Sequence, residues 1–117
     1  MILAVLDDLM FTSKIRTTAS QLGVRVVFAR SRDGALTALR GERPTLVILD
    51  LNSPRVEPIG IVADMKADPA LADIATVGFA SHVQTAVIEA ARAAGVTEVM
   101  ARSAFTQRLP ELLSRGK

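Results

Sequence analysis

The chain of 117 residues has no cysteine, no tryptophan, no tyrosine and only four phenylalanines. Without thiols it can form neither a disulfide nor a thiolate metal site. No apolar run approaches the ~18 residues that a membrane span needs. Met1–Leu6 is apolar, but it lacks a basic start and ends at two aspartates, unlike a signal peptide. We therefore expect a cytoplasmic protein whose core is built from Ala, Val, Leu and Ile.

A strong charge of one sign is also missing. The sequence has 14 Lys and Arg against 12 Asp and Glu, which gives a net charge of +2. A positive excess could favour acidic partners. The arginines are scattered, however, and no aromatic residues alternate with them as they do in a single-strand binder. We therefore expect a solvated surface that binds neither nucleic acid nor membrane. The length suits a single domain, residues 1–117.

The stretch around which the chain is organised is Leu46–Pro54, which reads LVILDLNSP. Four apolar residues run directly into Asp50, and Pro44 and Pro54 bound the stretch. A continuous apolar run of this kind is typical of a strand that is buried on both faces. Because a charge inside such a strand is costly, we expect Asp50 at its carboxyl end, where the chain emerges toward water.

A second acidic site stands in the same relation to its strand. Asp7 and Asp8 follow the apolar run Ile2–Leu6. Ligands of open α/β sheets bind at the carboxyl ends of the strands. Three carboxylates gathered there would repel one another unless a cation neutralised them, and Mg²⁺ suits oxygen ligands. With the cation present, an exposed Asp50 could attack phosphorus and form an acyl phosphate.

The rest of the chain alternates short strand patterns with helical ones. We expect strands at Ile2–Leu6, Val24–Ala29, Thr45–Leu49, Ile74–Ala80 and Val96–Ala101. We expect helices at Met10–Leu22, from the cap Ser31 through Arg40, at Ile59–Ala67 with Pro58 in its first turn, at Val83–Ala94 and at Ala104–Leu113. Such alternation implies right-handed crossovers and a parallel sheet. The pattern predicts an α/β fold, a (βα)5 doubly wound sandwich.

The sequence resembles the receiver domains of two-component response regulators over essentially its whole length. The matching pieces are Ala4-Val-Leu-Asp-Asp8, Leu46-Val-Ile-Leu-Asp-Leu-Asn-Ser-Pro54, Lys66-Ala-Asp-Pro-Ala-Leu-Ala-Asp-Ile74 and Gly95-Val-Thr-Glu-Val99. The resemblance implies a flavodoxin-like fold with strand order 2-1-3-4-5. It also implies that Asp50 is the phosphoacceptor. Asp7, Asp8, Asp50 and the backbone carbonyl of Asn52 would bind Mg²⁺.

The function that the resemblance implies is signalling rather than enzymatic. The chain would be a stand-alone, cytoplasmic receiver in a phosphorelay, phosphorylated by a histidine kinase or a phosphotransfer protein. It would act through protein contact, using the face of Val83–Ala94 and Ala104–Leu113, and a homodimer is a further option.

Three positions depart from the family pattern. Ala80 occupies the place of the Thr or Ser whose hydroxyl bonds the phosphoryl group. Ser81, one residue later, could substitute only if the strand end bulges. Arg102 replaces the family Lys; it keeps the charge and can bind phosphate in a bidentate manner, but it is bulkier. The switch aromatic falls on Val99, which has no ring.

Each of these residues also has a simpler interpretation. Asp50 could order a turn, and Asp8 or Thr12 could cap a helix. Ser81 fits an N-cap for Val83–Ala94 better than it fits a phosphate ligand, and Arg102 could be a solvated cation. The lone His82 fits a loop better than a catalytic base.

Three other functions compete with a working receiver. The first is a pseudo-receiver, an interaction module that is not phosphorylated, which the loss of the hydroxyl and the aromatic favours. A small metal-dependent phosphohydrolase is disfavoured because no general acid is evident. A nucleotide or flavin carrier is weaker still, because no Gly-rich phosphate loop follows any strand.

Overall fold

The computed structural model describes residues 1–81 and 85–116. The strands are β1 (Ile2–Val5), β2 (Val26–Ala29), β3 (Leu46–Asp50), β4 (Ala75–Ala80) and β5 (Glu98–Ala101). The helices are α1 (Leu9–Leu22), α2 (Arg32–Gly41), α3 (Pro58–Ala67), α4 (Thr85–Ala94) and α5 (Arg102–Ser114). The expected helix start at Val83 lies outside the described residues.

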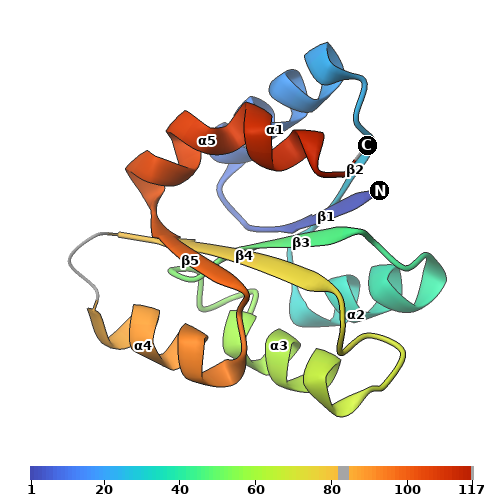
Figure 1. Ribbon diagram of the computed structural model, residues 1–117, viewed down its shortest axis with the longest axis vertical. Coiled ribbons are helices and arrows are strands. Elements are labelled where there is room, and N and C mark those ends of the chain that lie inside the picture. Colours follow the sequence, from blue (N-terminus) through green and yellow to red (C-terminus); the bar gives the residue numbers. More distant parts are fainter. Residues whose placement is uncertain (82–84, 117) are drawn as a thin grey trace.

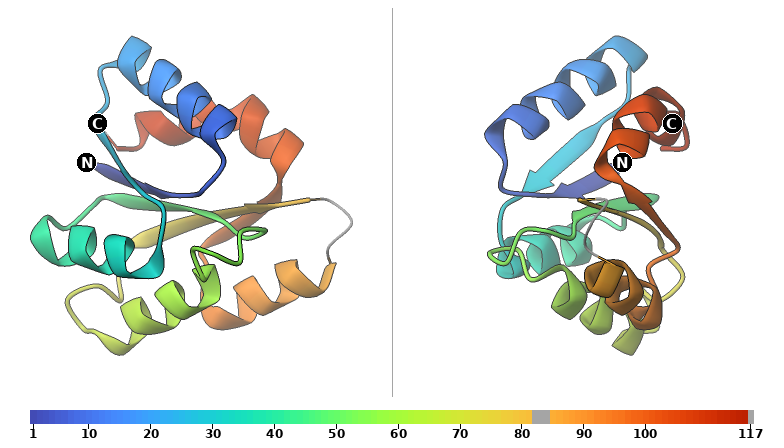
Figure 2. Two further views of the ribbon diagram at one scale, coloured as in Figure 1. Left: turned by 180° about the vertical axis from the view of Figure 1, so that it is seen from behind. Right: turned by 90° about the vertical axis from the view of Figure 1, so that its left-hand side faces the viewer.

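The five strands form one parallel sheet in the order β2-β1-β3-β4-β5. Helices α1 and α5 cover one face of the sheet, and α2, α3 and α4 cover the other (Figures 1 and 2). The predicted flavodoxin-like fold and its strand order are therefore confirmed. Within the described residues, no helix is long and apolar enough to cross a membrane.

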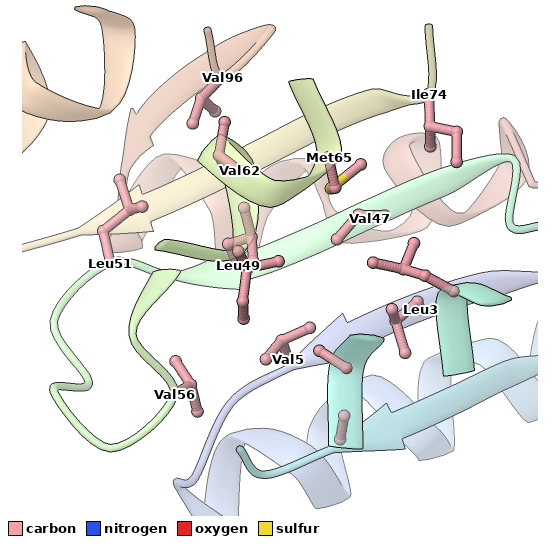
Figure 3. Packing of buried hydrophobic residues seen from close by; sticks show 14 of the residues in the cluster. Leu3, Val5, Val47, Leu49, Leu51, Val56, Val62, Met65, Ile74 and Val96 are labelled. Carbon is pink, nitrogen blue, oxygen red and sulfur yellow. The ribbon is translucent and has the colours of Figure 1, made fainter. Parts of the chain in front are cut away.

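Side chains that alternate along the strands fill two cores, one on each face of the sheet. Leu3, Val5, Val47 and Leu49 pack into the core on the side of α2, α3 and α4, where Figure 3 shows Val47 and Leu49 facing Val62 and Met65 of α3. The strand residues between them pack toward α1 and α5; they are Ile2, Ala4, Leu46 and Ile48. All these side chains are at most 2% exposed, so the central strands are held from both sides.

The start of β5 differs from the prediction for a physical reason. The strand begins at Glu98 rather than at Val96. Ahead of it, Thr97 and Thr76 exchange hydrogen bonds through their hydroxyls: the amide of Thr76 donates to Thr97 Oγ1 (3.0 Å), and the amide of Thr97 donates to Thr76 Oγ1 (2.8 Å). Side chains therefore make the contacts that a strand ladder would make.

Candidate functional site at the carboxyl edge of the sheet

Asp50 is the last residue of β3 and pairs with Phe79 of β4. It lies at the carboxyl end as predicted, but its side chain is only 6% exposed, so the expectation of an exposed carboxylate is wrong. A buried carboxylate needs partners. Asp50 Oδ1 accepts a hydrogen bond from the amide of Asn52 at 3.0 Å. The turn after the strand thus supplies a donor that water would otherwise provide.

Asp7 and Asp8 follow β1, which lies next to β3 in the sheet. Asp8 is the N-cap of α1, because its Oδ1 accepts from the amide of Phe11 at 3.0 Å. The Asp8 cap interpretation is therefore confirmed. The other oxygen, Oδ2, faces the guanidinium of Arg102. Asp7 Oδ2 lies 3.5 Å from Nε of Arg55, a pairing that the sequence analysis did not anticipate.

Arg102 connects the two strand ends. Its Nη1 lies 3.8 Å from Asp8 Oδ2, and its Nη2 lies 3.7 Å from Asp50 Oδ2. Both distances are too long for hydrogen bonds, so the attraction is electrostatic. The guanidinium also lies over the rings of Phe11 (5.1 Å to the centroid) and Phe79 (5.6 Å). Its side chain is 42% exposed and thus remains open to water.

Burial raises the pKa of Asp50 above its usual value. The amide of Asn52 and the charge of Arg102 oppose this rise, whereas the charges of Asp8 and Asp7 add to it. The charges of Asp7 and Asp8 therefore act on Asp50 across the two strand ends. Arg102 is the cation that favours an ionised Asp50.

The end of β4 keeps a regular ladder. Asp50 pairs with Phe79, and Ala80 pairs with Ala101, without a bulge. The condition that would let Ser81 replace the missing hydroxyl is therefore not met within the strand. Ala80 is fully buried. Ser81 instead donates its amide to Oδ1 of Asn52 at 2.7 Å, which ties the loop after β3 to the end of β4.

The sequence also singled out Val99 and His82. Val99 is half-buried on β5, and His82 lies outside the described residues. The aromatic support for Arg102 was missed because Phe11 and Phe79 come from different elements. A weak signal existed: Phe79 directly precedes Ala80, at the end of a strand next to the Asp50 strand.

The donor set has the chemistry that Mg²⁺ requires, because carboxylate oxygens converge from two neighbouring strand ends. In residues 1–81 and 85–116, however, no group of three or more His, Cys, Asp or Glu side chains is already gathered as a metal cluster. Asp8 and Asp50 share the guanidinium of Arg102 instead. The residues fit a dication, provided that Arg102 gives way to it.

Comparison with known proteins places this site in context. No family model matches the chain. A segment of 67 residues, 57% of the chain, is 31% identical to the probable transcriptional regulator ycf27 of Cyanophora paradoxa, and the match spans only 28% of that protein.

Solved structures match almost the whole chain. The receiver domain of NtrX from Brucella abortus is 21% identical with a TM-score of 0.82, over 99% of this chain and 97% of that one. The phosphorylated cyanobacterial phytochrome response regulator RcpA is 25% identical (TM-score 0.81; 96% and 86% covered). The Mn²⁺-bound response regulator Rcp1 is 19% identical (TM-score 0.81; 97% and 91% covered). The chain therefore has the fold of response-regulator receiver domains, and the resemblance stated from the sequence is confirmed.

Proposed function

We propose that the chain is a phosphorylatable receiver domain, with Asp50 as the acceptor. The observation that carries the proposal is that Asp8 and Asp50, from neighbouring strand ends, both face the guanidinium of Arg102. Mg²⁺ would be held by Asp7, Asp8, Asp50 and the backbone carbonyl of Asn52. The similar response regulators that were solved phosphorylated and Mn²⁺-bound support the same two states here.

The chemistry is transfer of a phosphoryl group to a carboxylate. An Oδ of Asp50 would attack phosphorus, while the bond to the donor's nitrogen or oxygen breaks and its electron pair leaves with the donor. Mg²⁺ would neutralise charge on the phosphoryl oxygens. Arg102 supports the reaction in two ways, because its charge favours ionised Asp50 and its donors can bind phosphate oxygens. Ala80 offers no hydroxyl, so Arg102 would bear more of that task.

The proposed donors are a histidine kinase or a phosphotransfer protein, and the proposed output is protein contact. Helices α4 and α5 flank β5, the strand at one edge of the sheet. This edge includes most of the face predicted from Val83–Ala94 and Ala104–Leu113, and it could also form a homodimer. Val83 itself lies outside the described residues.

Intact-protein mass spectrometry tests the proposal. After incubation with Mg²⁺ and acetyl phosphate, the wild type should gain about 80 Da, the mass of one phosphoryl group. Asp50→Asn should gain nothing. Asp73→Asn is the matched control, because Asp73 is exposed and precedes β4, at the opposite edge of the sheet. A gain that persists in Asp50→Asn would reject Asp50 as the acceptor.

A second candidate function is an interaction module that is not phosphorylated. The observation that favours it is the fully buried Ala80 at the end of an unbulged β4, which leaves the phosphoryl site without its hydroxyl. In that case the folded wild type would show no mass gain from acetyl phosphate with Mg²⁺ present. It would still bind its partner, and Asp50→Asn would bind that partner equally well.

A further inference from the structure

The position of Arg102 has a consequence for the domain without metal. We propose that Arg102 is a built-in counter-cation that competes with Mg²⁺ for Asp8 and Asp50 and thereby sets the metal affinity of the site. The domain would hold its acidic strand ends together without a metal ion, and Mg²⁺ would bind only as the guanidinium moves away. This inference rests on the magnesium site of the proposed function and deepens it, because it concerns how tightly the site binds Mg²⁺ and not whether Asp50 is phosphorylated.

The positive charges already present at the site oppose the binding of a dication. Asp7, Asp8 and Asp50 contribute three negative charges, and Arg55 and Arg102 return two positive ones. Arg55 is mostly exposed and pairs with Asp7, so water and salt screen its charge. Arg102 lies within 4 Å of two carboxylates, one of which is buried. A dication on the same oxygens would therefore lie close to the positive charge of Arg102, and the repulsion opposes its binding.

The aromatic rings of Phe11 and Phe79 favour this position of the guanidinium. Phe79 is fully buried, with its ring stacked on Phe105 at 4.5 Å and on Phe11 at 5.1 Å. The guanidinium lies over both Phe11 and Phe79, and cation–π attraction adds to the pull of the carboxylates. The stacked rings therefore support the guanidinium in this position.

An arginine suits this position better than a lysine would. A guanidinium presents several donors in a planar fork, so it can face Asp8 with one nitrogen and Asp50 with another while it lies over a ring. A lysine ammonium is a compact point charge that is more strongly hydrated, and it has no plane to stack. Arg102 is thus a positioning residue suited to bridging two carboxylates.

Magnesium titration of three proteins tests the inference. We would follow the binding of Mg²⁺ by ¹H–¹⁵N NMR, at constant ionic strength, for wild type, Arg102→Gln and Arg108→Gln. Arg108 is the matched control, because it lies on the same helix with similar exposure but pairs with Glu111. Arg102→Gln should bind Mg²⁺ about tenfold more tightly than wild type, the scale expected for removing one partly screened charge. Arg108→Gln should match wild type.

The outcomes separate cleanly. The inference is overturned if Arg102→Gln binds Mg²⁺ no more tightly than wild type, or not at all. A second readout uses the wild type alone and covers the case of a variant that fails to fold. Saturating Mg²⁺ should move the Arg102 Nε–Hε resonance as the guanidinium leaves the rings of Phe11 and Phe79. An unmoved resonance at saturation would reject the competition. The mass-spectrometric test of Asp50 is independent, so the two proposals can fail separately.

Discussion

At the scale of single residues, the site is defined by the burial of Asp50. The carboxylate is nearly hidden from water and is stabilised by one amide and by a guanidinium 3.7 Å away. Burial is the largest influence on its pKa, and the net effect is a rise. The folded protein therefore holds this proton more tightly than the unfolded chain does. The ionised form of Asp50 therefore lowers the free energy of unfolding, and the fold tolerates this loss to keep a reactive carboxylate in place.

Asp50→Asn should therefore stabilise the protein at pH 7 in EDTA, by about 1 kcal/mol. As pH rises from the usual carboxyl pKa of 3.8 through the raised folded pKa, the wild type loses stability and the neutral amide does not. The advantage of the variant should vanish at about pH 3, where both states hold the proton. Urea unfolding followed by circular dichroism measures this, since the chain has no Trp or Tyr. Equal stability of the two proteins at both pH values would contradict the burial argument.

The sequence predicted that Asp7, Asp8 and Asp50 lie at one edge of a parallel sheet, because each follows an apolar run that forms a strand. It did not predict the burial of Asp50 or the cation that Asp8 shares with it. Those depend on where a long arginine side chain extends, and packing against rings from two other elements decides that. The chain-order pattern carries no such information.

At the scale of elements, Asp8 serves α1 and the site at once. One oxygen caps the helix and the other faces Arg102. Asparagine caps a helix about as well as aspartate but carries no charge. Alanine neither caps the helix nor carries a charge. The pair of substitutions therefore separates the two roles.

Asp8→Ala should be less stable than Asp8→Asn by about 1 kcal/mol, the usual value of an N-cap. Both variants lose the same charge, so the difference isolates the hydrogen bond to the amide of Phe11. Urea midpoints of the two proteins measure it. Both should also bind Mg²⁺ more weakly than wild type. If the two variants unfolded at the same urea concentration, the cap would have no energetic role.

Gly78 explains how β4 approaches the loop that follows β3. A Cβ at this position would lie 2.8 Å from Cδ1 and 3.0 Å from Cγ of the buried Leu51. The sequence analysis predicted strand four around this glycine, and the lack of a side chain makes room for Leu51.

Gly78→Ala should cost about 1–3 kcal/mol through overpacking. The same change in a Leu51→Ala background should cost much less, because the colliding atoms are gone. Gly60→Ala is the control: its Cβ would meet only the guanidinium of Arg32, the end of a flexible side chain, and alanine favours the helix. Thermal unfolding of the variants checks the order. A full Gly78→Ala penalty that persisted without Leu51 would contradict this account.

At the scale of the whole molecule, two cores share one sheet. The strand order was predictable because apolar runs alternate with amphipathic helices and leave little topological choice. Element ends were less predictable. Thr76 and Thr97 hydrogen-bond each other through their amides and hydroxyls, so β5 begins later in the chain than predicted. Neither residue alone predicts this pairing. The side-chain network at the edge depends on the finished fold.

The shared sheet predicts that the molecule unfolds as one unit. Leu49 faces the core under α3, and Phe105 of α5 lies in the core on the other face; both are fully buried. Leu49→Ala should cost about 2–5 kcal/mol and Phe105→Ala about 3–5 kcal/mol. Because neighbouring residues of β3 belong to opposite cores, loss of either core should destabilise the same transition. Circular dichroism and amide hydrogen exchange should thus report one coincident unfolding curve for each variant. Two separate transitions, with only one moved by each substitution, would mean that the cores fold independently.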